Sequence, residues 1–168
     1  MSNIVLIGMP GSGKSTLGVL LAKALGYSFI DTDLIISQKA NKTLQQILDS
    51  DGLDSFLELE ERVGYELKCD KTVIATGGSM VLSGKAMQNL SSDATVVYIN
   101  VPFDEIKRRV TNIKTRGIAF RENETLEIIY GNREPLYKKY ADITVNVSEE
   151  GQSVGETVSE LARRLKQK

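Results

Sequence analysis

The residues from Gly8 to Ser15 have the types and the spacing that hold phosphate groups. Their order, Gly-Met-Pro-Gly-Ser-Gly-Lys-Ser, matches the Walker A pattern. The glycines let the backbone turn its N–H groups toward phosphate oxygens, and a helix that begins there adds the positive end of its dipole. Lys14 would then reach the β- and γ-phosphates, while the Ser15 hydroxyl would hold Mg²⁺. We therefore predict a site for a nucleoside triphosphate with Mg²⁺.

Two aspartates, Asp31 and Asp33, directly follow the apolar run Tyr27–Ile30. Ligands of open α/β folds collect at the carboxyl ends of such strands. Residues i and i+2 of an extended segment point the same way, so we expect both carboxylates to face the phosphate site rather than to serve only as a turn or a helix cap. One would lie near Mg²⁺ and its waters and the other near an acceptor hydroxyl, which is a workable division of roles in phosphoryl transfer.

The elements that must position these residues alternate between two patterns. Short β-branched apolar runs at 4–7, 27–30, 72–75, 96–99 and 143–147 are separated by stretches of helical periodicity such as 15–25, 44–49, 56–68, 103–110 and 154–165. This alternation predicts an α/β fold, a three-layer α/β/α sandwich around a parallel sheet of about five strands. Residues 111–125 are polar and interrupt the pattern, and we expect them to form a mobile lid over the site.

Composition excludes several classes of function. With 168 residues, 41% of them hydrophobic and 26% charged, the chain has the make-up of one globular domain spanning residues 1–168. Its net charge of -1 gives no general reason to expect nucleic acid or an anionic membrane as a partner. We also expect the protein to be a monomer. Histidine is absent, which excludes Ser-His hydrolysis and histidine metal ligands. The single cysteine, Cys69, and the lack of a leader-like or long apolar segment favour the cytoplasm.

A phosphate loop alone does not separate kinases from other nucleotide-hydrolysing proteins. No Asn-Lys-x-Asp motif for reading a guanine base is present, because the nearest match, at 41–44, lacks the aspartate. The strand predicted at 72–75 ends in Thr-Gly-Gly, so the usual acidic residue of a Walker B strand is also missing. Another carboxylate must therefore support the metal.

Several motifs occur in an order that resembles the shikimate kinase family, within the nucleoside monophosphate kinase-like group of P-loop enzymes. They are the phosphate loop through Thr16, Asp-Thr-Asp at 31–33, the helix at 56–61, Ala-Thr-Gly-Gly at 75–78 and Asn-Arg-Glu-Pro-Leu-Tyr at 132–137. The resemblance implies transfer of the ATP γ-phosphoryl group to the 3-hydroxyl of shikimate, a small carboxylate-bearing acceptor.

The same resemblance implies a role for each matching residue. The catalytic residues would be Lys14, Asp33 and Arg116, with Asp33 holding the acceptor hydroxyls as a candidate base. Asp31 would support Mg²⁺ through water, beside Ser15. The acceptor pocket would use Asp33 with Gly77, Gly78 and Arg133, the arginine gripping the substrate carboxylate. ATP would be bound by Gly11, Ser12, Gly13, Lys14, Ser15, Thr16, Arg109, packed against adenine, and Arg116, closing over the phosphates.

Three positions depart from the family pattern. Leu57 stands where the family has the second arginine of the carboxylate clamp, Ser79 replaces a third glycine, and Gly117 replaces the proline of the lid. Loss of the arginine should weaken carboxylate binding by about 2–4 kcal/mol, or roughly 30- to 1,000-fold. Two other functions therefore stay open at this point. One is a related kinase for a different small hydroxy metabolite, and the other is a nucleotide-binding protein without catalysis.

Overall fold

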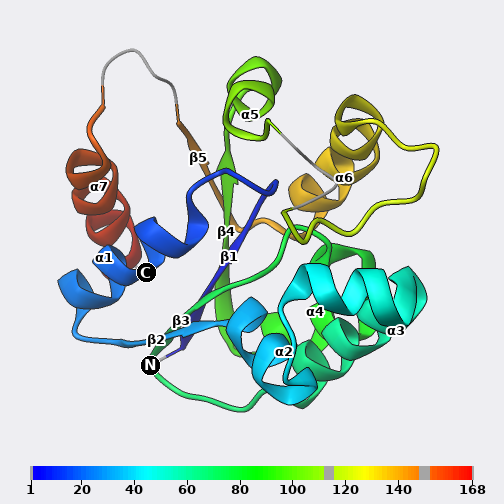
Figure 1. Cartoon of the computed structure of the whole chain (residues 1–168). Coiled ribbons are helices and arrows are strands. Elements are labelled where there is room, and N and C mark those ends of the chain that lie inside the picture. Colours follow the sequence, from blue (N-terminus) through cyan, green and yellow to red (C-terminus); the bar gives the residue numbers. More distant parts are fainter. Residues whose placement is uncertain (1, 112–115, 148–151, 168) are drawn as a thin grey trace.

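The computed structural model describes residues 2–111, 116–147 and 152–167, and within them a five-stranded parallel sheet is flanked by helices (Figure 1). The strands are β1 (Asn3–Ile7), β2 (Ser28–Asp31), β3 (Thr72–Ala75), β4 (Ala94–Asn100) and β5 (Ile143–Asn146). They are ordered β2-β3-β1-β4-β5 in the sheet, with every neighbouring pair parallel. The prediction of an α/β fold with a five-stranded parallel sheet is confirmed.

Helices cover both faces of the sheet. Figure 1 shows α1 (Lys14–Leu25) and α7 (Val154–Lys166) packed together on one face, with α4 (Gly84–Ser91) and α6 (Leu126–Tyr140) on the other. The helices α2 (Thr32–Ala40) and α3 (Leu44–Glu66) pack against each other beside α4, and α5 (Phe103–Arg109) follows β4. This arrangement brings the carboxyl ends of β1, β2 and β3 to one edge, where ligands of such folds bind.

The core lies between the sheet and its helices. All five residues of β1 are buried, as expected for a strand covered on both faces, and β3 is buried throughout. A smaller apolar cluster, centred on Ile36, Ile47 and Phe56, joins α2 to α3. That second cluster fixes the helices that carry the acceptor side of the site.

The long helix α3 joins two segments that the sequence pattern separates. Its backbone departs from helical geometry at Gly52, where φ is 87° and ψ is 169°, so the two pieces meet at a kink. The expected pieces, 44–49 and 56–68, lie on either side of this kink. The sequence periodicity therefore indicated the break near Gly52, but it did not predict that the two pieces form one long helix.

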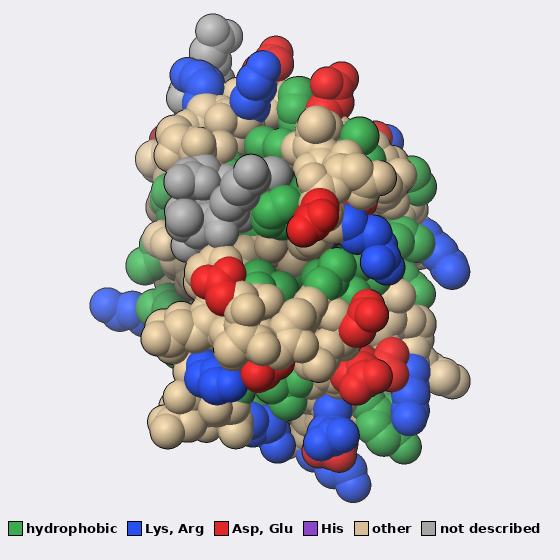
Figure 2. Space-filling view, turned by 45° about the vertical axis from the view of Figure 1, so that its right-hand side comes forward, with side chains coloured by type: hydrophobic (Ala, Val, Ile, Leu, Met, Phe, Trp, Pro, Cys, Tyr) green, Lys and Arg blue, Asp and Glu red, His purple; other side chains and the backbone are tan. Residues whose placement is uncertain are grey.

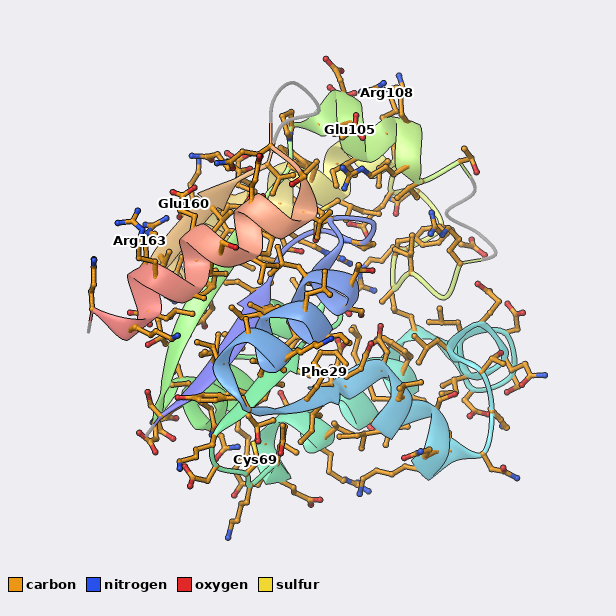
Figure 3. All side chains as sticks on the ribbon, turned by 90° about the vertical axis from the view of Figure 1, so that its left-hand side faces the viewer. Phe29, Cys69, Glu105, Arg108, Glu160 and Arg163 are labelled. Atoms are coloured by element: carbon orange, nitrogen blue, oxygen red, sulfur yellow. The ribbon has the colours of Figure 1, made fainter. Side chains whose placement is uncertain are left out.

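The surface carries both signs of charge. On the face in Figure 2, acidic and basic side chains are interspersed around a few apolar patches. Cys69 lies half-buried between α3 and β3, at the end of the sheet away from α5 (Figure 3). No helix within the described ranges is long and apolar enough to cross a membrane. The compartment and the monomeric state stay predictions.

Candidate active site

The phosphate loop connects β1 to α1, as the motif requires. The Nζ atom of Lys14 donates hydrogen bonds to the carbonyl oxygens of Gly8 and Met9, both at 2.8 Å, and to Oγ of Ser12 at 3.2 Å. Burial lowers the pKa of Lys14 to about 8, an effect that the nearby carboxylate of Asp33 opposes. The ammonium group is therefore held inside the loop, at the start of a helix whose N–H groups face the same space.

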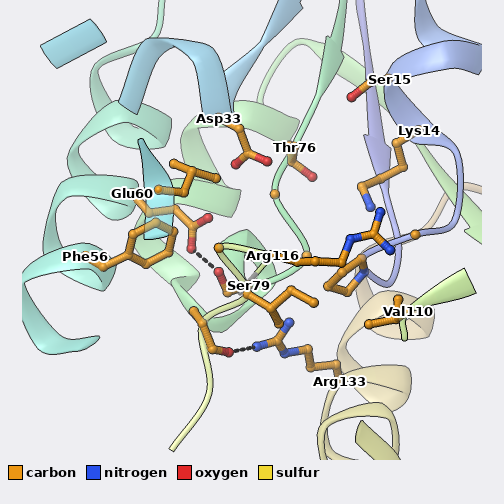
Figure 4. Close-up of a pocket in the computed structure, with 18 of the residues that line it drawn as sticks. Lys14, Ser15, Asp33, Phe56, Glu60, Thr76, Ser79, Val110, Arg116 and Arg133 are labelled. Carbon is orange, nitrogen blue, oxygen red and sulfur yellow. Dashed lines mark hydrogen bonds between the residues drawn. The ribbon is translucent and has the colours of Figure 1, made fainter. Parts of the chain in front are cut away.

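Asp31 links the phosphate loop to the start of α2. Its Oδ2 accepts a hydrogen bond from Oγ of Ser15 at 2.7 Å, and its Oδ1 accepts one from the backbone N–H of Asp33 at 2.9 Å. The expectation of an extended Asp-Thr-Asp segment was wrong, because Asp31 caps a helix and Asp33 lies in its first turn. The capping bond satisfies a helix N–H that would otherwise lack a partner. Asp33 nevertheless faces the cavity beside the loop (Figure 4).

A cavity of about 280 Å³ brings most of the predicted residues together. Figure 4 shows Asp33 and Glu60 on one side of it and Lys14 and Arg116 on the other. The predicted residues that line it are Gly11, Gly13, Lys14, Ser15, Thr16, Asp33, Gly77, Gly78, Arg116 and Arg133. Three predicted residues do not line it. Ser12 is hydrogen-bonded to Lys14, Asp31 is hydrogen-bonded to Ser15, and Arg109 is hydrogen-bonded to the backbone of the phosphate loop.

Gly77 lets two carboxylates approach the same backbone position. A Cβ atom at Gly77 would lie 2.7 Å from Oδ1 of Asp33 and 2.7 Å from Oε2 of Glu60. Real Cβ atoms do not come so close, so any other residue would push these groups aside. The loop after β3 thus supplies bare backbone between two acidic side chains at the cavity wall.

Both carboxylates have raised pKa values. Burial, followed by repulsion from Asp31, raises the pKa of Asp33 to about 6, while Lys14 opposes the rise. For Glu60, burial and then Asp33 raise the pKa to about 7 against the lowering effects of Ser79, Arg133 and Lys14. Clustered carboxyl groups with such values in a cavity are typical of a functional site.

Glu60 is a site residue that the sequence interpretation missed. It lies on the buried face of α3 with Phe56 and Val63, at helical spacings of four and three residues. A glutamate on an apolar helix face was the available signal, because charged side chains are rarely fully buried without a partner.

Arg133 enters the cavity from α6 and is only 4% exposed. One guanidinium nitrogen, Nη2, donates to the carbonyl oxygen of Ala119 at 2.5 Å. One turn later, the hydroxyl of Tyr137 donates to the carbonyl oxygen of Gly78 at 2.6 Å, which fixes the loop after β3, called the acceptor loop from here on, against the same helix.

Two buried side-chain atoms of the cavity wall lack a hydrogen-bond partner within the described part of the chain. They are Oε2 of Glu60, which can only accept while the group is ionised, and Nη1 of Arg133, which can only donate. Leaving such groups unpaired costs about 1–3 kcal/mol each, and more when they are charged. The cavity wall therefore offers one acceptor and one donor to whatever enters.

The comparisons with known proteins agree with this geometry. The family model described as shikimate kinase matches residues 10–166. This chain belongs to the shikimate kinase family. A shikimate kinase of Actinobacillus pleuropneumoniae is 40% identical over 151 residues, covering 88% of this chain and 87% of its own length, and one of Clostridium botulinum is 40% identical over 152 residues, covering 88% and 89%.

Solved structures of the family share the fold. The shikimate kinase of Acinetobacter baumannii in complex with shikimate has a TM-score of 0.83 and 31% identity, covering 99% of this chain and 92% of that one. The shikimate kinase of Aquifex aeolicus has a TM-score of 0.83 and 31% identity, covering 98% of this chain and 96% of that one. As a member of this family, the protein is an ATP-dependent phosphotransferase that acts on a hydroxyl group.

The first family departure, Leu57, does not line the cavity of about 280 Å³, which is called the acceptor cavity from here on. It lines a neighbouring cavity of about 220 Å³, which shares Ala119 and Arg133 with the first. The rest of that wall combines apolar residues, such as Leu53 and Phe120, with the polar residues Arg121, Glu124 and Asn132. Among the residues that line both cavities, Arg133 is the arginine, and the space behind it has a wall of mixed polarity.

The second and third departures have local structural roles. Ser79 has a φ of −93°, which side chains adopt without strain, and its buried Oγ donates to Oε1 of Glu60 at 2.5 Å. Gly117 has a φ of 68°, a left-handed value that proline cannot adopt. Its N–H donates to Oε1 of Gln45 at 2.9 Å, which attaches this segment to α3.

Arg116 and Arg109 connect the segment to the phosphate loop. Nη1 of Arg116 donates to the carbonyl oxygen of Arg109 at 2.6 Å, and Nη1 of Arg109 donates to the carbonyl oxygen of Gly11 at 3.1 Å. Glu105, buried on α5, forms an ion pair with Arg109, in which its Oε1 lies 2.7 Å from Nε of the arginine. It also forms an ion pair with Arg108 (Figure 3). Contact of Arg109 with adenine stays a prediction, and residues 112–115 of the expected lid lie outside the described residues.

Proposed function

We propose that this kinase transfers the γ-phosphoryl group of ATP to the 3-hydroxyl of shikimate. The observation that carries the proposal is the pair of unpartnered atoms, Oε2 of Glu60 and Nη1 of Arg133, in residues that line the same cavity. An acceptor that has both a carboxylate and hydroxyls can satisfy both of them. The Acinetobacter baumannii relative, solved in complex with shikimate, supports this choice of acceptor.

The proposed roles follow from the charges around the cavity. Asp33 would hold the acceptor hydroxyl and take its proton, because its raised pKa suits a base at neutral pH. Lys14 and Arg116 would neutralise the charge that develops on the transferred group. Arg133 would bind the acceptor carboxylate, and the bare backbone at Gly77 would allow the ring to lie close.

Mg²⁺ fits the oxygen atoms beside the phosphate loop. The Ser15 hydroxyl donates a hydrogen bond to the Asp31 carboxylate at 2.7 Å. Hard oxygen ligands of this kind suit the ion. Ser15 would hold it directly and Asp31 through water. When bound with ATP, the ion would neutralise part of the phosphate charge.

We further propose that residues 1–168 act as one kinase domain, with segment 111–125 over the site. The described part of that segment supports this role, because Arg116 and Gly117 line the cavity. A different hydroxy metabolite as acceptor is not favoured. Its support was Leu57 and Ser79, of which Leu57 lines the neighbouring cavity rather than the acceptor cavity.

A coupled assay of ATP turnover with shikimate tests the proposal. We expect phosphorylation of shikimate to exceed that of other hydroxy acids offered at the same concentration. Lys14→Ala should lower kcat/KM at least 100-fold because a contact made in the transition state is lost. The control, Lys23→Ala, removes an exposed lysine of the same helix and should change little. Negligible turnover with millimolar shikimate would reject the proposal.

Leu57→Arg tests the carboxylate end of the pocket. The neighbouring cavity of about 220 Å³ gives the longer side chain room to reach the wall that Arg133 lines. We expect KM for shikimate to fall about 10-fold, since a charge-assisted hydrogen bond is gained. Leu57→Met is the matched control, because it fills similar space without charge. An unchanged KM in Leu57→Arg would contradict a carboxylate at this end.

A further inference from the structure

Ser79 and Glu60 form a buried pair at the acceptor cavity, between the loop after β3 and the helix α3. Their side chains line the cavity, and the two residues are 5% and 3% exposed. Oγ of Ser79 donates its single proton to Oε1 of Glu60 at 2.5 Å (Figure 4). This bond occupies one carboxylate oxygen and fixes the rotation of the group.

The other carboxylate oxygen faces the acceptor loop. Oε2 of Glu60 has no partner in the described part of the chain and packs against Gly77. Because Oδ1 of Asp33 packs against the same glycine, the two acidic groups lie side by side along the cavity wall. A ligand that reaches Asp33 through one hydroxyl thus has Glu60 beside the next position.

We infer that Ser79 is a positioning residue that holds Glu60 so that its Oε2 accepts a hydrogen bond from a second, non-reacting hydroxyl of the acceptor. This inference rests on the proposed function, in which Asp33 takes the reacting hydroxyl. It assigns a specificity to the cavity: the acceptor must carry a hydrogen-bond donor beside the phosphorylated hydroxyl. An analogue with a keto group or hydrogen at that position leaves the buried oxygen unpaired.

The charge state of Glu60 links this pair to pH. Asp33 from α2 raises its pKa, whereas Arg133 from α6, Lys14 from α1 and the Ser79 hydroxyl lower it. Burial is the largest effect and raises the pKa, to about 7 in total. Removing the Ser79 hydroxyl removes one of the lowering contributions, so Glu60 takes up its proton at a higher pH. A protonated carboxyl no longer offers two free accepting oxygens.

The test is the pH profile of kcat/KM for shikimate at saturating ATP. In Ser79→Ala we expect the acidic limb to move to higher pH and kcat/KM at neutral pH to fall roughly 10-fold or more. Ser79→Gly restores the residue expected in the family and should show the same changes as Ser79→Ala. Agreement between the two variants would argue against a folding defect as the cause. In Glu60→Gln the side chain cannot ionise, so adding Ser79→Ala should move the limb no further.

The matched control is Ser83→Ala. Ser83 also donates to a glutamate of α3, with its Oγ 2.5 Å from Oε2 of Glu61, but neither residue lines the cavity. It caps α4, so its loss should lower stability while the pH profile stays that of the parent.

Acceptor analogues give the second readout. Shikimate analogues that each lack one non-reacting hydroxyl are compared in the parent and in Glu60→Gln. When the missing hydroxyl is the one that bonds to Glu60, kcat/KM of the parent should be roughly 10-fold or more lower for the analogue than for shikimate. Glu60→Gln should show a smaller difference between the two acceptors.

The outcomes separate the two proposals. If the parent does not phosphorylate shikimate, the proposed function is wrong and this inference falls with it. If the parent does, but its acidic limb coincides with those of Ser79→Ala and Ser79→Gly, only the inference is overturned. Equal discrimination among the analogues by the parent and Glu60→Gln overturns it as well.

Discussion

Replacing Glu60 by glutamine should make the protein more stable in mildly alkaline solution. Glu60 is 3% exposed, and burial raises its pKa from 4.5 to about 7. A carboxyl whose pKa is raised on folding contributes stability that is fully present below the unfolded value and is lost as pH rises through the folded one. The window for Glu60 therefore runs from pH 4.5 to about 7.

The size of the effect follows from these two values. Between pH 5 and pH 8 the parent should lose about 2.5 kcal/mol of unfolding free energy through this group, a loss that Glu60→Gln avoids. For a chain of this length, that corresponds to about 5–10 °C in Tm. Glutamine has nearly the same shape and can still accept the hydrogen bond from Ser79, so the comparison isolates the charge.

Urea and thermal unfolding at both pH values measure the difference. The quantity to compare is the gap between the parent and Glu60→Gln, because groups far from Glu60 titrate equally in both proteins. Glu58→Gln makes the same chemical change at an exposed position of α3 and should follow the parent. An equal gap at pH 5 and pH 8 would refute the reasoning that Glu60 is ionised at a cost in the folded protein.

Three further changes test the acceptor wall. Arg133→Lys keeps the charge but loses the planar fork, so KM for shikimate should rise roughly 10- to 100-fold while KM for ATP stays within a few-fold; an equal rise for both substrates would contradict the assignment. Gly77→Ala places a methyl group 2.7 Å from Oδ1 of Asp33 and from Oε2 of Glu60, so both carboxylates must shift and steady-state kinetics should show a higher KM for shikimate; an unchanged KM would contradict this. Tyr137→Phe leaves the carbonyl of Gly78 without its 2.6 Å bond, and urea unfolding should show a loss of about 1–3 kcal/mol; unchanged stability would mean that this bond contributes nothing.

The phosphate loop and the strands could be predicted because their signals are local. Glycine spacing and the buried run before it define the loop, and β3 has the bounds that its apolar run indicated, 72–75. The helices α2 and α6 were not singled out. The first buries only Thr32 and Ile36 and exposes 62% of Leu34, so its apolar periodicity is weak. The second contains Pro135, which normally interrupts a helix.

The acceptor side could be predicted only in part because it depends on contacts between distant residues. Arg133, Gly77 and Gly78 were identified through the family motifs, and they do line one cavity. The role of Glu60 becomes apparent only when α3 is packed against the loop that carries Ser79, 19 positions away. Similarly, the capping role of Asp31 depends on where α2 begins, which the alternating pattern does not specify.

The short stretch from Arg116 to Ala119 touches both halves of the site. At one end Arg116 is bonded to the backbone of Arg109, which holds the phosphate loop, and at the other end the carbonyl of Ala119 holds Arg133. A shift of this stretch on nucleotide binding would therefore reposition the guanidinium that meets the acceptor. Binding of the two substrates would then be thermodynamically linked, and each would change the affinity for the other by the same factor.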